Sequence, residues 1–367
     1  MTEESEGYSP FKPTPGTGLT GVLRRLAGGV KAWILRGVLD DDGLYHRHIQ
    51  QFPDRIFMMG TTICNARCTF CPQSTHIDKK MVMEEEVFAK VIAEFGAKGG
   101  KRATMNPNNG DPLVDPRFVE RARQARAAGV QWLDVSTNGI LLGRGDTAVG
   151  LAAVMDRVRI SLPGLDHDDY LRVYGVDKAE ELRDGLEKLA RAKKDSGAKL
   201  DIVLDLRVDR PLADVLRDDG MVALAPYIDD GTIRIDYGQI YSEMETWSDQ
   251  VTAEQLPGTM RLRTDIPERP RPCKRMFTDV AVLADGQIRV CACRYRATNY
   301  DDMVVGDTKT DTIEAIVFGP AHRRILQRAA AGDWPMVCHG CTLYQPHDYP
   351  RTTWVRMAIG RIQGLFH

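Results

Sequence analysis

The eight cysteines of this 367-residue chain restrict its fold most, because they form two groups that lie far apart in the sequence. Three stand close together at Cys64, Cys68 and Cys71. After about two hundred residues without a cysteine, the other five follow at Cys273, Cys291, Cys293, Cys338 and Cys341. Because a cytosolic chain keeps its thiols reduced, grouped cysteines indicate metal ligands before disulfides. The pattern therefore predicts two metal sites separated by a long cysteine-free region.

The composition argues against several other classes of protein. The chain carries 49 Lys and Arg against 51 Asp and Glu, a net charge of −2, so it has no general electrostatic footprint for nucleic acid. No apolar run approaches the roughly eighteen residues of a membrane span. Residues 1–14 are acidic and rich in Pro and Gly, unlike a signal peptide. We therefore expect a cytoplasmic protein without a nucleic-acid partner.

Short apolar runs alternate with helical patterns through the middle of the chain. The runs cover residues 55–62, 102–106, 132–136, 157–162, 200–208 and 232–236, and the helical patterns cover 84–95, 116–128, 147–155, 178–196 and 212–224. Asp115 is expected to cap the second helix, with Pro116 at its first position. Such alternation predicts parallel strands covered by helices. Six units fall short of a closed barrel of eight, so we expect a partial (β/α)6 TIM-like barrel.

The remaining segments suggest a division into five parts. We expect a lead-in with an amphipathic helix over 1–54, the barrel over 55–237, a linker over 238–272, a small α+β domain over 273–345, and a C-terminal amphipathic helix over 346–367. Within the small domain, runs at 277–283 and 287–291 flank Asp285-Gly286, a strong hairpin signal. Helices are expected near 311–318 and 321–330.

The first cysteine group follows the first predicted strand with the spacing C-x3-C-x2-C. Three thiolates can hold a cuboidal four-iron cluster and leave one iron open to a ligand. The alternative is a zinc site, which favours four ligands and could recruit His76 as the fourth.

Together with Phe70 before the third cysteine, this motif resembles the signature of the radical SAM superfamily. The resemblance covers about residues 55–236 and implies a [4Fe-4S] cluster that binds S-adenosylmethionine (SAM). It implies SAM contacts for six residues: Phe70, Gly110, Asp111, Ser136, Asn138 and Ser161. Asn109-Gly110-Asp111-Pro112 resembles the family's Gly-Gly-Glu-Pro, with Asp in place of Glu. The alternative role for Asp111, Ser136 and Asn138 is an ordinary turn at a strand end.

The second cysteine group can close a cluster completely through Cys273, Cys291, Cys338 and Cys341. A structural zinc site with four cysteines is the alternative. The layout resembles the SPASM/twitch branch of the superfamily, which implies a single auxiliary [4Fe-4S] cluster.

Cys293 remains outside both sets, and three roles are open to it. Positions 291 and 293 of a strand face the same side, so Cys293 could replace Cys291 as a ligand. It could give a hydrogen atom to a substrate radical, as the resemblance to epimerases of this superfamily implies. It could also be a small apolar residue beside the cluster.

The resemblance implies an enzyme that reductively cleaves SAM to a 5′-deoxyadenosyl radical. That radical would abstract hydrogen from a small carbohydrate, aminocyclitol or nucleoside-like substrate in natural-product biosynthesis. An auxiliary cluster that accepts an electron would give dehydrogenation, and hydrogen return from a thiol would give epimerisation. The expected electron donor is a flavodoxin or ferredoxin. The alternatives are modification of a ribosomally made peptide and, from another class, a non-catalytic zinc-binding protein.

Both ends of the chain carry basic amphipathic patterns. Apolar residues recur at helical spacing over 19–38 and again over 351–367, with Arg and Lys between them. Such helices can lie on an anionic membrane surface, which would make the protein peripheral at the membrane. The alternative is that they cover the barrel or pack together.

Overall fold

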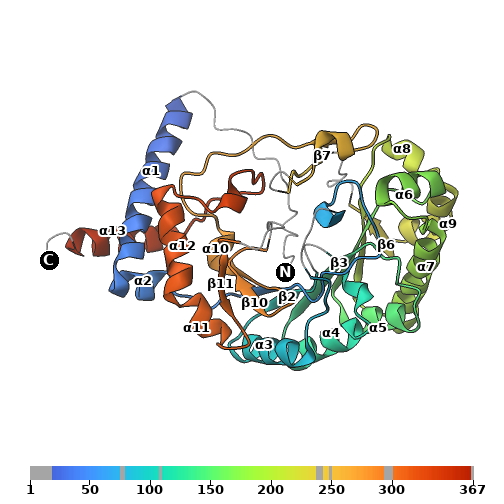
Figure 1. The fold of residues 1–367 in the computed structure, drawn as a ribbon, viewed down its shortest axis with the longest axis horizontal. Helices are drawn as coiled ribbons and strands as arrows, with labels where there is room; N and C mark the ends of the chain where they lie inside the picture. Colours follow the sequence, from blue (N-terminus) through green and yellow to red (C-terminus); the bar gives the residue numbers. More distant parts are fainter. Residues whose placement is uncertain are drawn as a thin grey trace.

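The computed structural model describes residues 19–74, 79–106, 110–236, 243–247, 250–292 and 301–364. Its centre is a nine-stranded sheet in the order β11-β10-β9-β1-β2-β3-β4-β5-β6 (Figure 1). The first six strands pair in parallel and in sequence order. They are β1 (Arg55–Met58), β2 (Arg102–Thr104), β3 (Trp132–Thr137), β4 (Arg157–Leu162), β5 (Asp201–Leu206) and β6 (Ile233–Ile235). The predicted partial barrel of six parallel strands is confirmed.

Helices cover the outer, convex side of these strands (Figure 1). They are α3 (Glu85–Ala97), α4 (Phe118–Ala127), α5 (Thr147–Val154), α7 (Ala179–Ser196) and α9 (Asp219–Asp229). The helix predicted over 212–224 is wrong, because the chain forms α8 (Leu212–Val215) and then α9. Asp218 separates them, since its carboxylate binds Arg210 at 2.5 Å and accepts the backbone N–H of Leu165.

Two further departures concern helix starts. The helix expected to begin at Pro116 begins at Phe118, so the prediction of Asp115 as its cap is wrong. Asp115 instead accepts the backbone N–H of Arg117 at 2.9 Å and pairs with Arg121 at 3.2 Å. The short helix α6 (His167–Tyr174) was not predicted, although Asp166 caps its start and Gly175, at φ 66°, ends it.

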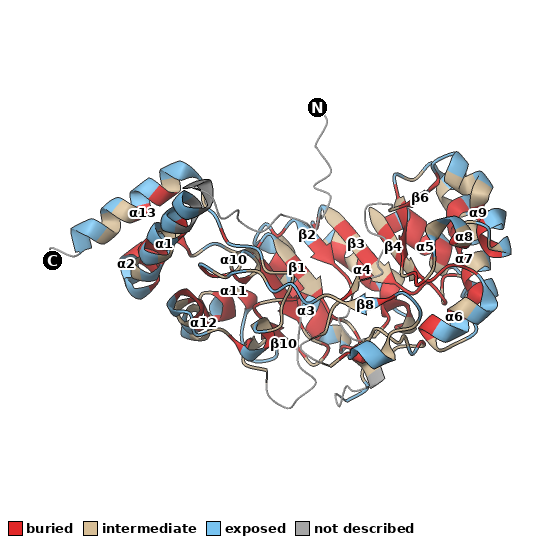
Figure 2. Ribbon diagram, turned by 90° about the horizontal axis from the view of Figure 1, so that it is seen from above, coloured by how far each residue is buried: buried red, intermediate tan, exposed pale blue. Residues whose placement is uncertain are grey.

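The two faces of the barrel strands differ in chemistry. In β4, Val158, Ile160 and Leu162 are buried, while the alternate side chains are half-buried (Figure 2). The buried set packs with the helices in the main core. The polar set includes Arg157, Arg159 and Ser161, because side chains alternate along a strand. The concave face of the barrel is therefore polar and charged.

The predicted hairpin of the C-terminal domain is confirmed. Strands β9 (Asp279–Val282) and β10 (Gln287–Arg289) pair antiparallel around Gly286, whose φ is 95°, and β11 (Val304–Asp307) pairs with β10. Strand β9 pairs in parallel with β1. The C-terminal domain therefore continues the sheet of the barrel rather than forming a sheet of its own.

Between barrel and hairpin, the region expected as a linker contains a small sheet. Strands β7 (Glu243–Met244) and β8 (Arg261–Leu262) pair in parallel, with a 3-10 turn at Ala253–Gln255 between them. The segment is therefore partly ordered by backbone pairing.

Helices from both ends of the chain meet in a second core. Those helices are α1 (Leu19–Asp40), α2 (Asp42–His48), α10 (Arg275–Thr278), α12 (Pro320–Ala331) and α13 (Arg351–Gly364), whereas α11 (Ile313–Val317) packs into the main core. Leu35, Val38 and Leu39 of α1 are buried in one cluster with Leu326 of α12 and Met357 of α13. Helix α1 runs unbroken through Gly28-Gly29. Among the described helices, none is long and apolar enough to cross a membrane.

Candidate active site and metal centres

The loop that carries the first cysteine group follows the carboxyl end of β1. Cys64, Cys68 and Cys71 are all partly accessible within it. The backbone N–H of Arg67 donates to Tyr174 O at 2.9 Å. The N–H of Thr69 donates to Val173 O at 3.0 Å. The end of α6 therefore holds the loop in place, although no motif marked this helix.

Gly110 brings the end of β2 against this loop. Its φ is 129°, and a Cβ added there would lie 2.9 Å from Thr61 O and 3.0 Å from Ile63 O. The N–H of the next residue, Asp111, donates to Ile63 O at 2.8 Å. Only glycine combines this φ with such a close backbone approach.

The buried Asp111 carboxylate ties two strand ends together. It accepts the Thr137 hydroxyl at 2.8 Å, the Asn138 N–H at 2.7 Å and the Leu113 N–H at 3.0 Å. Burial raises the pKa of Asp111, although these hydrogen bonds oppose the shift. The structure thus shows Asp111 in a turn role, and its contact with SAM stays a prediction.

Asn138 lies directly beside the first cysteine group. Its Nδ2 is 3.9 Å from Cys64 Sγ and donates to Asn65 Oδ1 at 2.8 Å. Ser136 precedes it by two positions and lies near the end of β3. Both predicted SAM contacts therefore stand at the carboxyl end of β3, where ligands of parallel α/β folds bind.

Ser161 and Phe70 are joined through Tyr174 of α6. The Ser161 hydroxyl lies 2.7 Å from the Tyr174 hydroxyl and accepts from Arg207 Nε at 3.2 Å. The Phe70 ring meets the Tyr174 ring edge-on, with centroids 5.6 Å apart. Neither Tyr174 nor Arg207 belongs to a motif that the sequence displays. The cap residues around α6 were the one local signal for Tyr174.

The surroundings of Cys64, Cys68 and Cys71 suit a bound iron–sulfur cluster with a polar ligand. Burial raises the pKa of Cys64 to about 12 and also raises the pKa of Cys68 and Cys71, so a cation must stabilise the thiolates. In the described part of the chain, four buried polar atoms close to this loop in sequence or on α6 have no hydrogen-bond partner. They are Asn65 Nδ2, Thr69 Oγ1, Gln73 Oε1 and Tyr170 Oη. Such atoms are unusual in a folded protein unless a ligand satisfies them.

A charged group occupies the concave face beside Ser161. Arg159 lies 2.8 Å from the Asp205 carboxylate and 3.4 Å from that of Asp236. Ser161 pairs in register with Asp205 on the next strand. Burial raises the pKa of Asp205, against the effect of Arg159. No motif in the sequence pointed to these residues.

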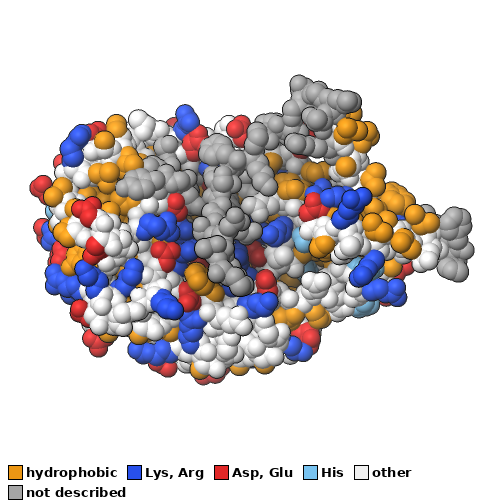
Figure 3. Space-filling view, turned by 180° about the vertical axis from the view of Figure 1, so that it is seen from behind, with side chains coloured by type: hydrophobic (Ala, Val, Ile, Leu, Met, Phe, Trp, Pro, Cys, Tyr) orange, Lys and Arg blue, Asp and Glu red, His pale blue; other side chains and the backbone are white. Residues whose placement is uncertain are grey.

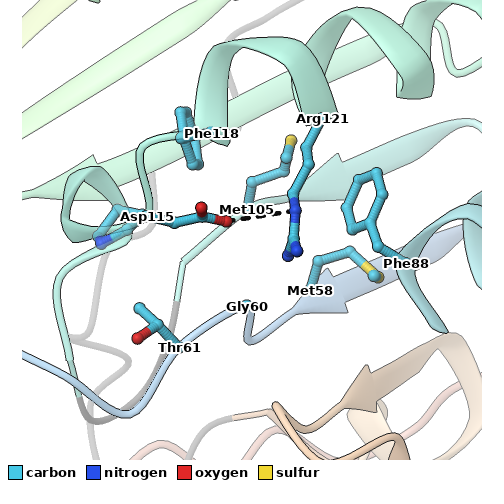
Figure 4. Close-up of a pocket in the computed structure, with 9 residues that line it drawn as sticks. Met58, Gly60, Thr61, Phe88, Met105, Asp115, Phe118 and Arg121 are labelled. Carbon is cyan, nitrogen blue, oxygen red and sulfur yellow. Dashed lines mark ion pairs between the residues drawn. The ribbon is translucent and has the colours of Figure 1, made fainter. Parts of the chain in front are cut away.

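A small cavity lies behind the first cysteine loop, and the residues that line it have a structural role. Figure 4 shows Arg121 and Asp115 pointing toward one another among Met58, Met105 and other apolar side chains. Arg121 also donates to Met83 O. The pair thus anchors helix α4 beneath the segment that leads into the loop.

The four predicted auxiliary ligands line one cavity in the C-terminal domain. They are Cys273, Cys291, Cys338 and Cys341. Trp334 and Tyr344 also line this cavity. Burial raises the pKa of Cys273 to about 11 and shifts that of Cys338 upward. Among the described residues, no three His, Cys, Asp or Glu side chains are placed to hold a single metal ion.

Arg289 provides a buried positive charge next to this cavity. It is fully buried and pairs with Asp301 at 2.5 Å. Although burial lowers the pKa of Arg289, Asp301 and the neighbouring Cys291 and Cys338 raise it above its usual value. The guanidinium therefore favours negative charge on the cysteine sulfurs.

The two cysteine groups lie at opposite ends of the barrel strands, one at the carboxyl ends and the other at the amino ends. Cys64 follows the carboxyl end of β1, whereas Asp279 at the start of β9 pairs with Arg55 at the amino end. Cys273 precedes β9 and Cys291 follows the antiparallel β10, so both lie at the amino ends of the barrel strands. Cys293, the predicted hydrogen donor, lies outside the described residues.

Two family models match the chain. The Radical SAM superfamily matches residues 58–217, and the SPASM iron–sulfur cluster-binding domain matches residues 273–342. The two matches contain all seven cysteines predicted as ligands.

Similar proteins include one curated relative and two solved structures of another protein. GTP 3′,8-cyclase of Chlorobaculum tepidum is 28% identical over 137 residues, which cover 37% of this chain and 41% of that protein. SuiB of Streptococcus suis bound to S-adenosylmethionine has a TM-score of 0.54 at 12% identity, over 83% of this chain and 79% of SuiB. SuiB bound to its precursor peptide SuiA has a TM-score of 0.51, also at 12% identity, over 82% and 73%. The match thus spans about two fifths of the curated relative, and the likeness to SuiB concerns the fold.

Proposed function

Because this chain belongs to the SPASM branch of the radical SAM superfamily, we propose that it abstracts hydrogen from a C–H bond of a small polar substrate. The substrate class we propose is a carbohydrate, an aminocyclitol or a nucleoside-like molecule, and the outcome is dehydrogenation or epimerisation. A reduced [4Fe-4S] cluster with SAM bound would supply a 5′-deoxyadenosyl radical for this step.

The observation that carries this proposal is the charged group on the concave face. Arg159, Asp205 and Asp236 stand beside Ser161, which belongs to the predicted SAM site. Carboxylates accept hydrogen bonds from hydroxyl and amino groups, and a guanidinium donates to hydroxyl, carbonyl or phosphate oxygens. A substrate rich in such groups matches this lining, and an apolar substrate would leave the charges desolvated.

The chain's own residues divide the work of holding the cofactors. Cys64, Cys68 and Cys71 would hold the SAM-binding cluster, and the four cysteines of the C-terminal cavity would hold one auxiliary [4Fe-4S] cluster. The six predicted SAM contacts would orient the ligand, with Gly110 and Asp111 shaping the turn that supports it. This orientation sets which substrate carbon lies within reach.

The fate of the substrate radical decides between dehydrogenation and epimerisation. An auxiliary cluster that accepts an electron favours dehydrogenation, and a thiol such as Cys293 that returns hydrogen favours epimerisation. In either case an external reductant, such as a flavodoxin or a ferredoxin, would deliver electrons to the first cluster.

Similarity to other proteins supports two substrate classes. The curated relatives are named GTP 3′,8-cyclase, which favours a nucleoside-like molecule. The fold similarity to SuiB bound to a precursor peptide favours modification of a ribosomally made peptide as the second candidate function. The charged group beside Ser161 favours the small polar substrate.

Deuterium transfer tests the proposal directly. The anaerobically reconstituted enzyme is incubated with SAM, a reductant and one deuterated candidate at a time, and 5′-deoxyadenosine is analysed by mass spectrometry. Deuterium in 5′-deoxyadenosine from a carbohydrate, aminocyclitol or nucleoside supports it. Label arising only from a peptide would assign the second function.

A pair of variants tests the site. We expect Asp236→Asn to raise KM about tenfold or more, because a charge-assisted hydrogen bond to a substrate is lost. Asp201→Asn is the matched control. Asp201 lies on the same face of β5 as Asp205, but at the amino end of the strand, where it pairs with Arg157 at 2.8 Å. Equal effects of the two substitutions would contradict the assigned site.

A further inference from the structure

Helices α1 and α13 expose a concentration of large apolar side chains. Among the described residues, eight of the thirteen exposed large hydrophobic side chains belong to these two helices. We call them the terminal stripe, which consists of Val22, Leu23, Leu26, Val30, Trp33, Val355, Ile359 and Ile362. Leu26 is 63% exposed and Ile359 is 51% exposed. The other five exposed side chains are single residues on separate segments, which is ordinary for a folded protein.

The stripe residues lie on one face of each helix. At 3.6 residues per turn, the five positions of α1 fall within an arc of about 100°, and the three of α13 within about 60°. The opposite faces are already covered, because Leu35 and Val38 of α1 and Trp354 and Met357 of α13 are buried in the second core. The stripe is therefore a second apolar face, additional to the one that folding uses.

Contacts between the two helices make the stripe a single surface. The Arg361 guanidinium lies 4.0 Å from the Trp33 ring centroid and donates to Trp33 O. Lys31 of α1 pairs with Asp348, just before α13, at 2.7 Å. Figure 3 shows hydrophobic side chains gathered over this end of the molecule, with Lys and Arg beside them.

The charge around the stripe is predominantly positive, although Asp40 ends α1 and Asp348 pairs with Lys31. Residues 19–39 contain Arg24, Arg25, Lys31 and Arg36 and no acid, and residues 350–367 contain three arginines and no acid. The chain as a whole has a net charge of −2, so this segregation is local. A basic helix with an apolar face and a Trp suits the headgroup region of an anionic bilayer, where basic residues are attracted to the lipid phosphates.

We propose that the terminal stripe docks this protein on an anionic phospholipid surface, with α1 and α13 lying in the plane of the interface. The apolar side chains enter the boundary between headgroups and acyl chains, and the basic side chains contact lipid phosphates. The stripe lies at the end of the molecule opposite β6 and α9 (Figures 1 and 2). The barrel therefore extends away from the membrane, and the proposal is independent of the reaction.

Vesicle sedimentation of the reconstituted full-length protein tests this proposal. We expect it to sediment with vesicles of phosphatidylcholine mixed with phosphatidylglycerol, much less with phosphatidylcholine alone, and less as salt is added. Leu26→Ser combined with Ile359→Ser should lower the partition coefficient on mixed vesicles at least tenfold. Each change removes apolar burial in the interface, and a tenfold lower partition coefficient corresponds to about 1.4 kcal/mol. The changed side chains are exposed, so the fold should persist.

The control is Leu171→Ser combined with Val222→Ser, whose side chains are 52% and 55% exposed on α6 and α9. This control should bind vesicles like the wild type. The proposal is overturned if the wild type stays in the supernatant with mixed vesicles, or if control and stripe variants lose binding equally. A dimer in light scattering that the stripe variant abolishes would assign the stripe to a second copy of this chain instead.

Discussion

Arg289 and Asp301 form an ion pair at 2.5 Å beside the four-cysteine cavity, and the Arg289 side chain is fully buried. Arg289 belongs to β10, and Asp301 precedes β11, so the ion pair links β10 to the segment that leads into β11. Arg289 also donates to the carbonyl oxygen of Cys291, one of the predicted ligands. The ion pair thus links the packing of β10 and β11 to the position of Cys291 in the cavity.

Removing one partner of this ion pair should destabilise the protein strongly. We expect Arg289→Met to lower the free energy of unfolding by about 3–5 kcal/mol, because the Asp301 carboxylate stays buried without its partner. Combining it with Asp301→Leu should recover most of that loss, since a buried apolar pair carries no desolvation penalty. Urea unfolding of the wild type, both single variants and the double variant measures the coupling. Additive losses would show that the two residues act independently.

Local sequence patterns predicted the parts of the fold that depend on short-range periodicity. All six barrel strands, the Asp285-Gly286 hairpin and the terminal helices follow from the spacing of apolar residues and turn residues. The cysteine groups were found in the same way, because ligand spacing is a local property of a loop. The family models contain the seven cysteines to which the resemblance pointed.

Features that depend on pairing between distant segments could not be predicted. The parallel pairing of β9 with β1 joins residues more than two hundred positions apart, and no local pattern encodes a strand's partner. The same holds for Arg159 with Asp236, which meet only after β4, β5 and β6 have paired. Helix 212–224 divides for a similar reason, because Asp218 accepts the backbone N–H of Leu165, 53 positions earlier in the chain.

A methyl group at Gly110 should disturb the first cysteine loop. In Gly110→Ala the Cβ would lie 2.9 Å from Thr61 O, and φ 129° is strained for any L residue. We expect a loss of iron bound at Cys64, Cys68 and Cys71, together with a destabilisation above 1 kcal/mol. Gly197→Ala is the matched control, because Gly197 has φ 64° and open space around it. It should cost about 1 kcal/mol and leave the iron content unchanged.

His322 should make stability depend on pH. Burial lowers the pKa of His322, although the carbonyl oxygens of Val317 and Met276, at 2.7 and 2.8 Å from its ring nitrogens, oppose the shift. A lowered pKa means that the unfolded chain binds the proton more tightly, so stability is present above about pH 6.5 and is lost as the pH falls. The slope should approach 1.4 kcal/mol per pH unit, on the order of one proton.

Substituting His322 isolates this contribution. The midpoint of urea unfolding is measured at about one-unit intervals between pH 5 and 8. It should fall as the pH decreases in the wild type and in His46→Gln, an exposed control on α2. In His322→Gln this part of the slope should disappear, because the amide does not titrate. An unchanged slope would mean that other groups set the pH dependence.

Iron content should divide into two independent portions. After anaerobic reconstitution we expect about eight irons per chain, about four in Cys64→Ala and about four in Cys273→Ala, because each substitution opens one four-iron cluster. Colorimetric iron analysis and the visible spectrum measure both losses. A colourless protein that carries zinc would contradict iron–sulfur binding at these sites.

The same measurement decides the ligand role of Cys293. If Cys291 is the fourth auxiliary ligand, as its place in the C-terminal cavity indicates, Cys291→Ala should lose about four irons and Cys293→Ala none. The reverse result would make Cys293 the ligand in place of Cys291. With iron retained in Cys293→Ala, its activity becomes informative. Dehydrogenation needs no thiol donor, so full activity excludes Cys293 as a hydrogen donor, whereas a lost epimerisation supports that role.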